Sequence, residues 1–273
     1  MCIRDRFNSS GRTHCLVDVS GYFTASDGDR MVPVRPSRLF DTRTGVGTRR
    51  GKLRDGQSVD IKVAGKSGVP ESGATAVVMN LTVTEPESPG YLRMTPTGQA
   101  PGKTSNVNFW AGDTVPNLAV CRLGGGGRVT LYGVGEGAHA IGDVFGYFGE
   151  DGERLRATPP QRLLDTRIGK GAARQPLTGS RGVRLVTTGP GAVPPEATAV
   201  VLNVTATNVT GESYVSIWPA GESKTDTSNL NLAPGKTIAN LVVCRLGEAG
   251  AVELAIPRAK CDLIADLLGY FVD

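Results

Sequence analysis

The sequence predicts an all-β protein built from two tandem β-sandwich domains of the jelly-roll kind, and three observations support this. Turn residues are frequent, since 37 glycines and 17 prolines punctuate 273 residues. Short runs of alternating apolar and polar residues lie between the turns, which is the pattern of half-buried strands. Most of the chain also repeats at a nearly constant spacing, which is typical of domain duplication.

The repeat covers more than a hundred residues. RLFDTRTGVG (38–47) returns as RLLDTRIGKG (162–171), and AVVMNLTVT (76–84) returns as AVVLNVTAT (199–207). The later motifs follow in the same order, because TSNVNF, NLAVCRLG and DVFGYF of the first copy match TSNLNL, NLVVCRLG and DLLGYF of the second. Constant order and spacing indicate duplication of a whole domain. We predict repeat A over residues 31–148 and repeat B over residues 157–271, with polar, glycine-containing linkers at 24–30 and 149–157.

A third, partial copy precedes repeat A. HCLVDVSGYF (14–23) is similar to HAIGDVFGYF (139–148) at the end of repeat A. We therefore interpret residues 1–23 as the C-terminal remnant of a preceding copy. Residues 1–6 match nothing else in the chain and lack the apolar region of a signal peptide, so they are expected to be non-native.

The strand at 76–84 shows the pattern most clearly. Val77, Met79, Leu81 and Val83 share one face, and the second copy keeps this face apolar. Further strands are expected at 58–63, 91–95, 105–109, 118–123, 128–132 and 138–145. Seven or eight strands in each repeat fit a two-sheet sandwich or jelly roll. A β-trefoil or a pair of propeller blades is a less favoured alternative, and no threefold period of about 40 residues, which a trefoil would show, occurs within a repeat. GGGG (124–127) is expected to form a hairpin turn.

Composition and charge exclude several classes of function. The net charge is only +4, and the basic cluster Arg49, Arg50, Lys52 and Arg54 contains no aromatic residue, so a nucleic-acid partner is not expected. No run of 18 apolar residues is present, so membrane insertion is not expected. The absence of CxxC and DxDxDG motifs predicts no metal site.

The five cysteines are too few and too widely spaced for a disulfide framework. A bond between Cys244 and Cys261 is a candidate in repeat B. In repeat A, Cys121 has no matching partner, because Ala138 stands at the corresponding position. Such a bond would therefore not be essential to the fold.

The most suggestive polar residues are the repeated Asp-Thr-Arg motifs, with Asp41 and Arg43 in repeat A and Asp165 and Arg167 in repeat B. One interpretation is an Asp/Arg pair that binds sugar hydroxyls or a carboxylate. The other, which we favour, is a structural ion pair. In it the aspartate accepts backbone N–H bonds in a turn and the arginine reaches the region of Asp143 or Asp266.

Recurrent asparagines form a second candidate set, because asparagine is otherwise poor in strands. The set consists of Asn106, Asn108, Asn229 and Asn231, with Asn80, Asn203, Asn117 and Asn240 nearby in the motifs. A buried hydrogen-bond network that ties loops to the sheets is the favoured interpretation. A glycan-binding amide cluster is the alternative.

No catalytic set is predicted. The two histidines, His14 and His139, hold matching places in their copies, but no nucleophile motif accompanies them. In the last copy Asp262 takes the position of the histidine. We therefore expect no enzyme activity and no cofactor.

Taken together, the motifs P-x-R-L-x-D-T-R-x-G-x-G, A-V-V-x-N-V-T, S-N-x-N, A-N-L-V-V and D-V-x-G-Y-F resemble a tandem repeat domain of secreted bacterial proteins. The resemblance covers nearly all of both repeats. It implies secretion or cell-surface display, often beside peptidases, amidases or other hydrolases, in an accessory role.

The expected function is thus a non-catalytic structural or interaction module of an exported protein, acting as a spacer, display or adhesion repeat. The alternative is a module that binds cell-wall or environmental polysaccharide. The expected partners are such polysaccharides or attached catalytic domains of the parent protein.

Overall fold

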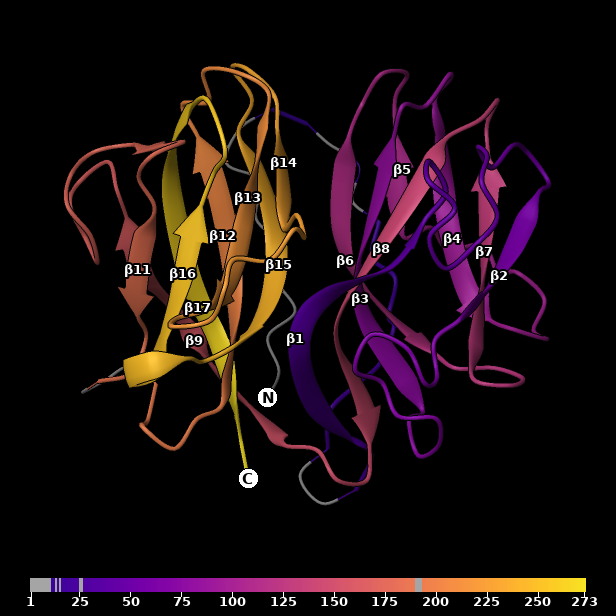
Figure 1. Cartoon of the computed structure of the whole chain (residues 1–273), viewed down its shortest axis with the longest axis horizontal. Helices are drawn as coiled ribbons and strands as arrows, with labels where there is room; N and C mark the ends of the chain where they lie inside the picture. Colours follow the sequence, from indigo (N-terminus) through magenta and orange to yellow (C-terminus); the bar gives the residue numbers. More distant parts are fainter. Residues whose placement is uncertain (1–10, 13, 15, 25–26, 190–192) are drawn as a thin grey trace.

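The computed structural model describes residues 11–12, 14, 16–24, 27–189 and 193–273. It is all-β, and within these residues the helical content is a single 3₁₀ turn at Glu248–Gly250. Figure 1 shows two sandwiches side by side, with repeat A in indigo to magenta and repeat B in orange to yellow. Residues 1–6, predicted to be non-native, lie outside the described residues.

Repeat A is an eight-stranded jelly roll of two antiparallel sheets, with the strand orders β1-β8-β3-β6 and β2-β7-β4-β5. This order is the jelly-roll topology, in which consecutive strands mostly cross between the sheets. The strands are β1 (Arg30–Asp41), β2 (Ser58–Lys62), β3 (Ala76–Thr84), β4 (Gly90–Pro96), β5 (Val107–Phe109), β6 (Val115–Arg122), β7 (Arg128–Val134) and β8 (His139–Gly149).

Repeat B has the same topology, with the orders β9-β17-β12-β15 and β11-β16-β13-β14 and a short additional strand β10 that pairs with β17. The prediction of two tandem jelly-roll-like sandwiches is therefore confirmed. The strands are β9 (Arg154–Asp165), β10 (Leu177–Thr178), β11 (Val183–Val186), β12 (Ala199–Thr207), β13 (Ser213–Pro219), β14 (Leu230–Leu232), β15 (Ile238–Arg245), β16 (Ala251–Ala255) and β17 (Lys260–Val272). We call β8 and β17 the closing strands, because each is the last strand of its repeat and lies between two earlier strands: β8 between β1 and β3, and β17 between β9 and β12.

Each repeat has its own core between its two sheets. Val77, Met79, Leu81 and Val83 of β3 point into the core of repeat A, as their alternation predicts. The opposite face of β3 is also buried, whereas β12 alternates between buried and partly exposed residues. The difference arises because repeat B covers the outer face of β3.

The two repeats pack through the outer faces of equivalent sheets. A separate apolar cluster lies between them, formed by Met31, Val78, Leu118 and Phe148 of repeat A with Leu155, Ala199, Val201, Val243 and Phe271 of repeat B. Three of these positions are matched between the copies: Met31 with Leu155, Val78 with Val201, and Phe148 with Phe271. The same surface patch thus meets itself, as in a two-fold interface, although the two copies are offset.

Asparagine side chains add hydrogen bonds across this interface. The Asn240 amide donates to Asn80 Oδ1 at 2.9 Å, and Asn80 Nδ2 donates to the carbonyl of Ser228 at 2.6 Å. The backbone N–H of Leu118 donates to Asn240 Oδ1 at 3.2 Å. At the rim, Arg35 pairs with Glu222 at 3.7 Å. The buried amides satisfy one another's polar groups, so burying them is not costly.

One local prediction is wrong, and a second holds only in part. The expected linker at 149–157 includes residues 154–157, which form the start of β9. GGGG (124–127) forms a tight turn closed by an antiparallel bridge between Gly124 and Arg128, but the strands it joins, β6 and β7, lie in opposite sheets. Close packing explains the last of these glycines: a Cβ on Gly127, whose φ is 66°, would lie 2.4 Å from Cβ of Ala64.

Candidate functional site

The Asp-Thr-Arg motif forms a compact corner at the end of the first strand in each repeat. In repeat A the carboxylate of Asp41 accepts the backbone N–H of Arg43 at 2.9 Å and the Arg43 guanidinium Nη2 at 2.7 Å. Asp41 is buried, and its backbone bonds to Gly45 and Val46 close the turn. The aspartate is thus committed to its own turn and to the arginine two residues later.

The electrostatics of this corner favour the charged pair. Burial opposes the carboxylate of Asp41, but hydrogen bonds and charge from Arg43 outweigh it and lower the Asp41 pKa. In repeat B the side-chain hydrogen bond from Arg167 is the largest influence, and it lowers the pKa of Asp165. Asp165 repeats the bonds of Asp41, with Arg167 Nη2 at 2.7 Å and the Arg167 backbone N–H at 3.1 Å.

The arginine that reaches the closing strand is not the one expected. Arg38, three residues before Asp41, donates to Asp143 on β8 and to Asp41. In repeat B, Arg162 donates to Asp266 on β17 at 2.8 Å. The expectation that Arg43 and Arg167 span to these aspartates is therefore wrong, because each is held by the aspartate of its own turn.

A threonine that sequence reasoning left unassigned fastens the corner to the closing strand. The Thr42 backbone N–H donates to the Ala140 carbonyl at 3.0 Å, and the Ala140 N–H donates to Thr42 Oγ1 at 2.9 Å. Thr166 makes the same two bonds with Leu263, both at 3.0 Å. The signal was present in the invariant Thr of both DTR motifs, but no spacing rule links it to a strand a hundred residues later.

Next to each corner the two repeats differ. In repeat A, Thr42 Oγ1 lies 3.0 Å from His139 Nδ1. Since Thr42 Oγ1 already accepts a backbone N–H, its own proton suits a neutral imidazole nitrogen. Burial lowers the pKa of His139, with Glu85 opposing this shift and Lys52 supporting it.

In repeat B, Asp262 replaces the histidine. Its carboxylate accepts hydrogen bonds from Thr166 Oγ1 at 2.8 Å and from Asn208 Nδ2 at 2.9 Å. These residues open onto a shallow polar cavity of about 340 Å³. The cavity is lined by Thr166, Arg167, Arg174, Gln175, Pro176, Asn208 and Asp262.

The recurrent asparagines bond to the backbone in both repeats, but burial differs: Asn229 and Asn240 are buried, whereas Asn106 is partly exposed and Asn117 is exposed. Asn106 Oδ1 accepts the backbone N–H of Met94 at 2.7 Å, and Asn229 Oδ1 accepts that of Ile217 at 2.8 Å. The backbone carbonyl of Asn106 accepts a hydrogen bond from Asn117 Nδ2 at 2.7 Å, and that of Asn229 accepts one from Asn240 Nδ2 at 2.8 Å.

The second asparagine of each S-N-x-N motif behaves differently. Asn231 Oδ1 accepts Ser228 Oγ at 2.9 Å, while Asn108 is exposed on β5. These asparagines therefore do not gather with the Asp-Thr-Arg corners into one site.

The candidate disulfide between Cys244 and Cys261 is not formed. Both thiols are free and buried in the core of repeat B. Cys244 lies beside Val200 at the start of β12, whereas Asp262, next to Cys261, pairs with Thr207 at its end. Seven residues of strand separate these points by roughly 20 Å, far beyond the span of a disulfide. Burial raises the pKa of each thiol to about 12.

Within the described parts of the chain, no group of three or more His, Cys, Asp or Glu side chains is placed to hold a metal ion. The same residues include no helix of the length and apolarity needed to cross a membrane.

Comparison with known proteins finds no matching family model and no matching curated protein. Solved structures are matched at low similarity. The tandem CBM22-1–CBM22-2 domain of Xyn10C from Paenibacillus barcinonensis is 10% identical with a TM-score of 0.25, over 86% of this chain and 98% of that one.

The PBSX exported protein XepA is 13% identical with a TM-score of 0.26, over 92% of this chain and 99% of that one. The major capsid protein P2 of bacteriophage PM2 is 11% identical with a TM-score of 0.21, over 89% and 98%. At these TM-scores the similarities carry no argument about function.

Proposed function

We propose that this chain is a non-catalytic structural module of an exported bacterial protein, in which two jelly rolls form one rigid spacer that displays attached domains. The observation that carries the proposal is the interface between the repeats. Apolar residues from both copies form a common cluster there, and the buried amides of Asn80 and Asn240 bond to each other across it. A joint of this kind resists bending, because any hinge motion would expose apolar surface and break buried hydrogen bonds.

The use of the repeated polar motifs supports the same proposal. Side chains of the recurrent motifs are engaged in bonds within their own repeat: Asp41 with Arg43, Thr42 with β8, and Asn106 with β4. Catalysis needs a polar group positioned toward a substrate. The groups that both copies retain instead hold strands and turns together.

Rigidity can be tested by small-angle X-ray scattering on the full chain. We expect a profile that one compact two-domain particle fits at all concentrations. The matched variant is Asn80→Ala with Asn240→Ala, which should broaden the distribution of distances between the repeats. A wild-type profile that requires a flexible ensemble would contradict the rigid-spacer proposal, and substrate turnover that His139→Ala abolishes would contradict the non-catalytic one.

Polysaccharide binding is a second candidate, favoured by the polar cavity of repeat B. Its guanidinium, amide and carboxylate groups are those that bind sugar hydroxyls. Pull-down on insoluble peptidoglycan, chitin and cellulose tests it. Saturable binding that is lost in Arg174→Ala and Gln175→Ala, which are exposed and remove no core contact, would favour this candidate over the spacer.

A further inference from the structure

Part of the outer face of repeat A is left open by repeat B. Val120 on β6 is 36% exposed, whereas its equivalent Val243 on β15 is 5% exposed because it packs into the cluster between the repeats. The same apolar position is therefore covered in one copy and open in the other. Beside Val120, an open cavity of about 770 Å³ extends over Ala76, Arg122 and Phe148.

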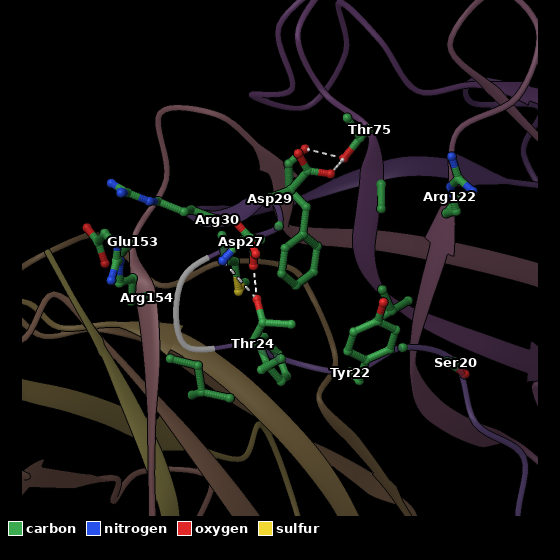
Figure 2. Close-up of a pocket in the computed structure, with 18 of the residues that line it drawn as sticks. Ser20, Tyr22, Thr24, Asp27, Asp29, Arg30, Thr75, Arg122, Glu153 and Arg154 are labelled. Atoms are coloured by element: carbon green, nitrogen blue, oxygen red, sulfur yellow. Dashed lines mark hydrogen bonds between the residues drawn. The ribbon is translucent and has the colours of Figure 1, made fainter.

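The other wall of this cavity is the partial copy that precedes repeat A. Residues 18–24 line it together with the start of β1, with Glu153 and with Arg154 at the start of β9. Figure 2 shows Tyr22 and Thr24 on this wall, Arg122 on a strand across the cavity, and Glu153 and Arg154 on the opposite side. The ring of Phe23 contacts the ring of Phe148, with their centroids 6.3 Å apart.

The partial copy carries the sequence of a closing strand but not its burial. Val19 corresponds to Val144 of β8, and it is 84% exposed where Val144 is fully buried. Tyr22 and Phe23, which correspond to Tyr147 and Phe148, are also exposed. These side chains are of the kind that the core of a jelly roll buries, and a cluster of exposed large apolar groups marks an interaction surface.

We propose that the open face around Val120 binds a further copy of this repeat, namely the copy whose closing strand is the segment at residues 16–23. The added copy would then contact repeat A through Phe23 and Phe148. The equivalent residues Phe148 and Phe271 both belong to the cluster between repeats A and B. The sequence identifies this partner, because residues 18–23, which line the cavity, resemble the closing strand of repeat A. The inference extends the proposed spacer role from a pair of repeats to an array.

The test uses a lengthened chain in which a second copy of residues 31–138 directly precedes His14. In that chain residues 14–23 can serve as the eighth strand of a complete repeat. Hydrogen exchange should show the backbone amides of residues 16–23 protected at least about tenfold more than in the 273-residue chain. Unchanged exchange would overturn the assignment of this segment as a closing strand.

Docking is read from one introduced thiol, at position 120. Val120→Cys in the original repeat A is placed in both chains, and its alkylation is followed by mass spectrometry. We expect alkylation to be at least about tenfold slower in the lengthened chain, because the added repeat covers the position. The matched control is Leu241→Cys, which is 37% exposed on repeat B and should react equally in both chains.

The two readouts separate the possible results. Protected amides at 16–23 together with unchanged alkylation at position 120 would mean that the added repeat folds but docks elsewhere, which overturns the proposal. In the lengthened chain, Val120→Arg should restore free exposure of Phe23 to hydroxyl-radical labelling without changing the exchange of residues 16–23. The rigidity of the pair of repeats A and B is measured separately by scattering, so failure here leaves that proposal standing.

Discussion

Repeat A and repeat B fill the same place in the core with different pairs of residues. In repeat A, Phe40 of β1 pairs with Gly142 of β8, and in repeat B, Leu164 of β9 pairs with Ala265 of β17. A large residue beside glycine has been exchanged for a smaller one beside alanine. The comparison teaches that the volume of a cross-strand pair is maintained, rather than the residue at either position.

Each repeat also has an equivalent ion pair between its first strand and its closing strand, but the two pairs differ in burial. The side chain of Asp143 is 1% exposed and is paired with Arg38, while that of Asp266 is 23% exposed and is paired with Arg162. Asp143 lies on the side of repeat A that repeat B covers, and the backbone of Ser228 from repeat B bonds to it. Equivalent ion pairs should therefore contribute unequally to stability.

The largest expected effect comes from removing these aspartates. Asp143→Ala should lower the free energy of unfolding by about 3 kcal/mol, because Arg38 keeps only Asp41 as a partner and the backbone of Ser228 loses its hydrogen bond to Asp143. Asp266→Ala should cost about 1 kcal/mol, because Arg162 remains solvated. Urea unfolding of both variants measures the difference, and equal losses would show that burial does not distinguish the two ion pairs.

Exchanging the core pair should give the next largest effect. A Cβ on Gly142 would lie 2.2 Å from Cε1 of Phe40, so Gly142→Ala should cost about 2 kcal/mol through overpacking. Adding Phe40→Leu recreates the pair of repeat B and should recover most of this loss. A double-mutant cycle in urea checks the coupling; an additive result would mean that the two positions do not share volume.

A smaller effect is expected at the asparagines that match in β3 and β12. Asn80 is buried and bonds to Asn240 and Ser228 of the other repeat, so Asn80→Ala should cost about 1.5 kcal/mol. Asn203 is only partly buried, and Asn203→Ala should cost less than about 0.5 kcal/mol. Thermal unfolding by calorimetry compares the two, and the prediction fails should Asn203→Ala prove the more harmful.

The smallest effect is the pH dependence of repeat A. The pKa of His139 is lowered by burial, so the unfolded chain binds a proton more readily than the folded one. The contribution of His139 to the free energy of unfolding should therefore be fully present above its pKa in the unfolded chain, about 6.5. It should be lost as the pH falls from there through the lower pKa of His139 in the folded chain. His139→Asp, which introduces the residue of repeat B, should remove this slope from unfolding curves recorded between pH 7 and pH 5.

Sequence patterns predicted the inner strands well, because alternation is strong where a strand has one face on a core. The strand at 76–84 has the predicted bounds. Sequence patterns did not predict β1 and β9, which contain Pro36 and the pair Pro159–Pro160. Both are edge strands whose register shifts occur around these prolines, and an edge strand tolerates proline because one side needs no partner.

The candidate site was predicted less well. That Asp41 accepts a backbone N–H in its own turn follows from local chemistry, and the structure shows it. The choice of Arg38 over Arg43 as the partner of Asp143 depends on the register between β1 and β8, which the sequence does not specify. The covered face of β3 could not be predicted either, since it depends on how the two repeats pack.

The position of the closing strand has a consequence for synthesis on the ribosome. β8 and β17 each lie between two strands made roughly 60 to 110 residues earlier, so these long-range pairings form only when the last strand has left the exit tunnel. Until then β1 and β3, and likewise β9 and β12, lack a common neighbour and expose unpaired edges. A nascent chain of this protein should therefore acquire stability in two late steps, one after each Gly-Tyr-Phe segment emerges, rather than gradually along its length.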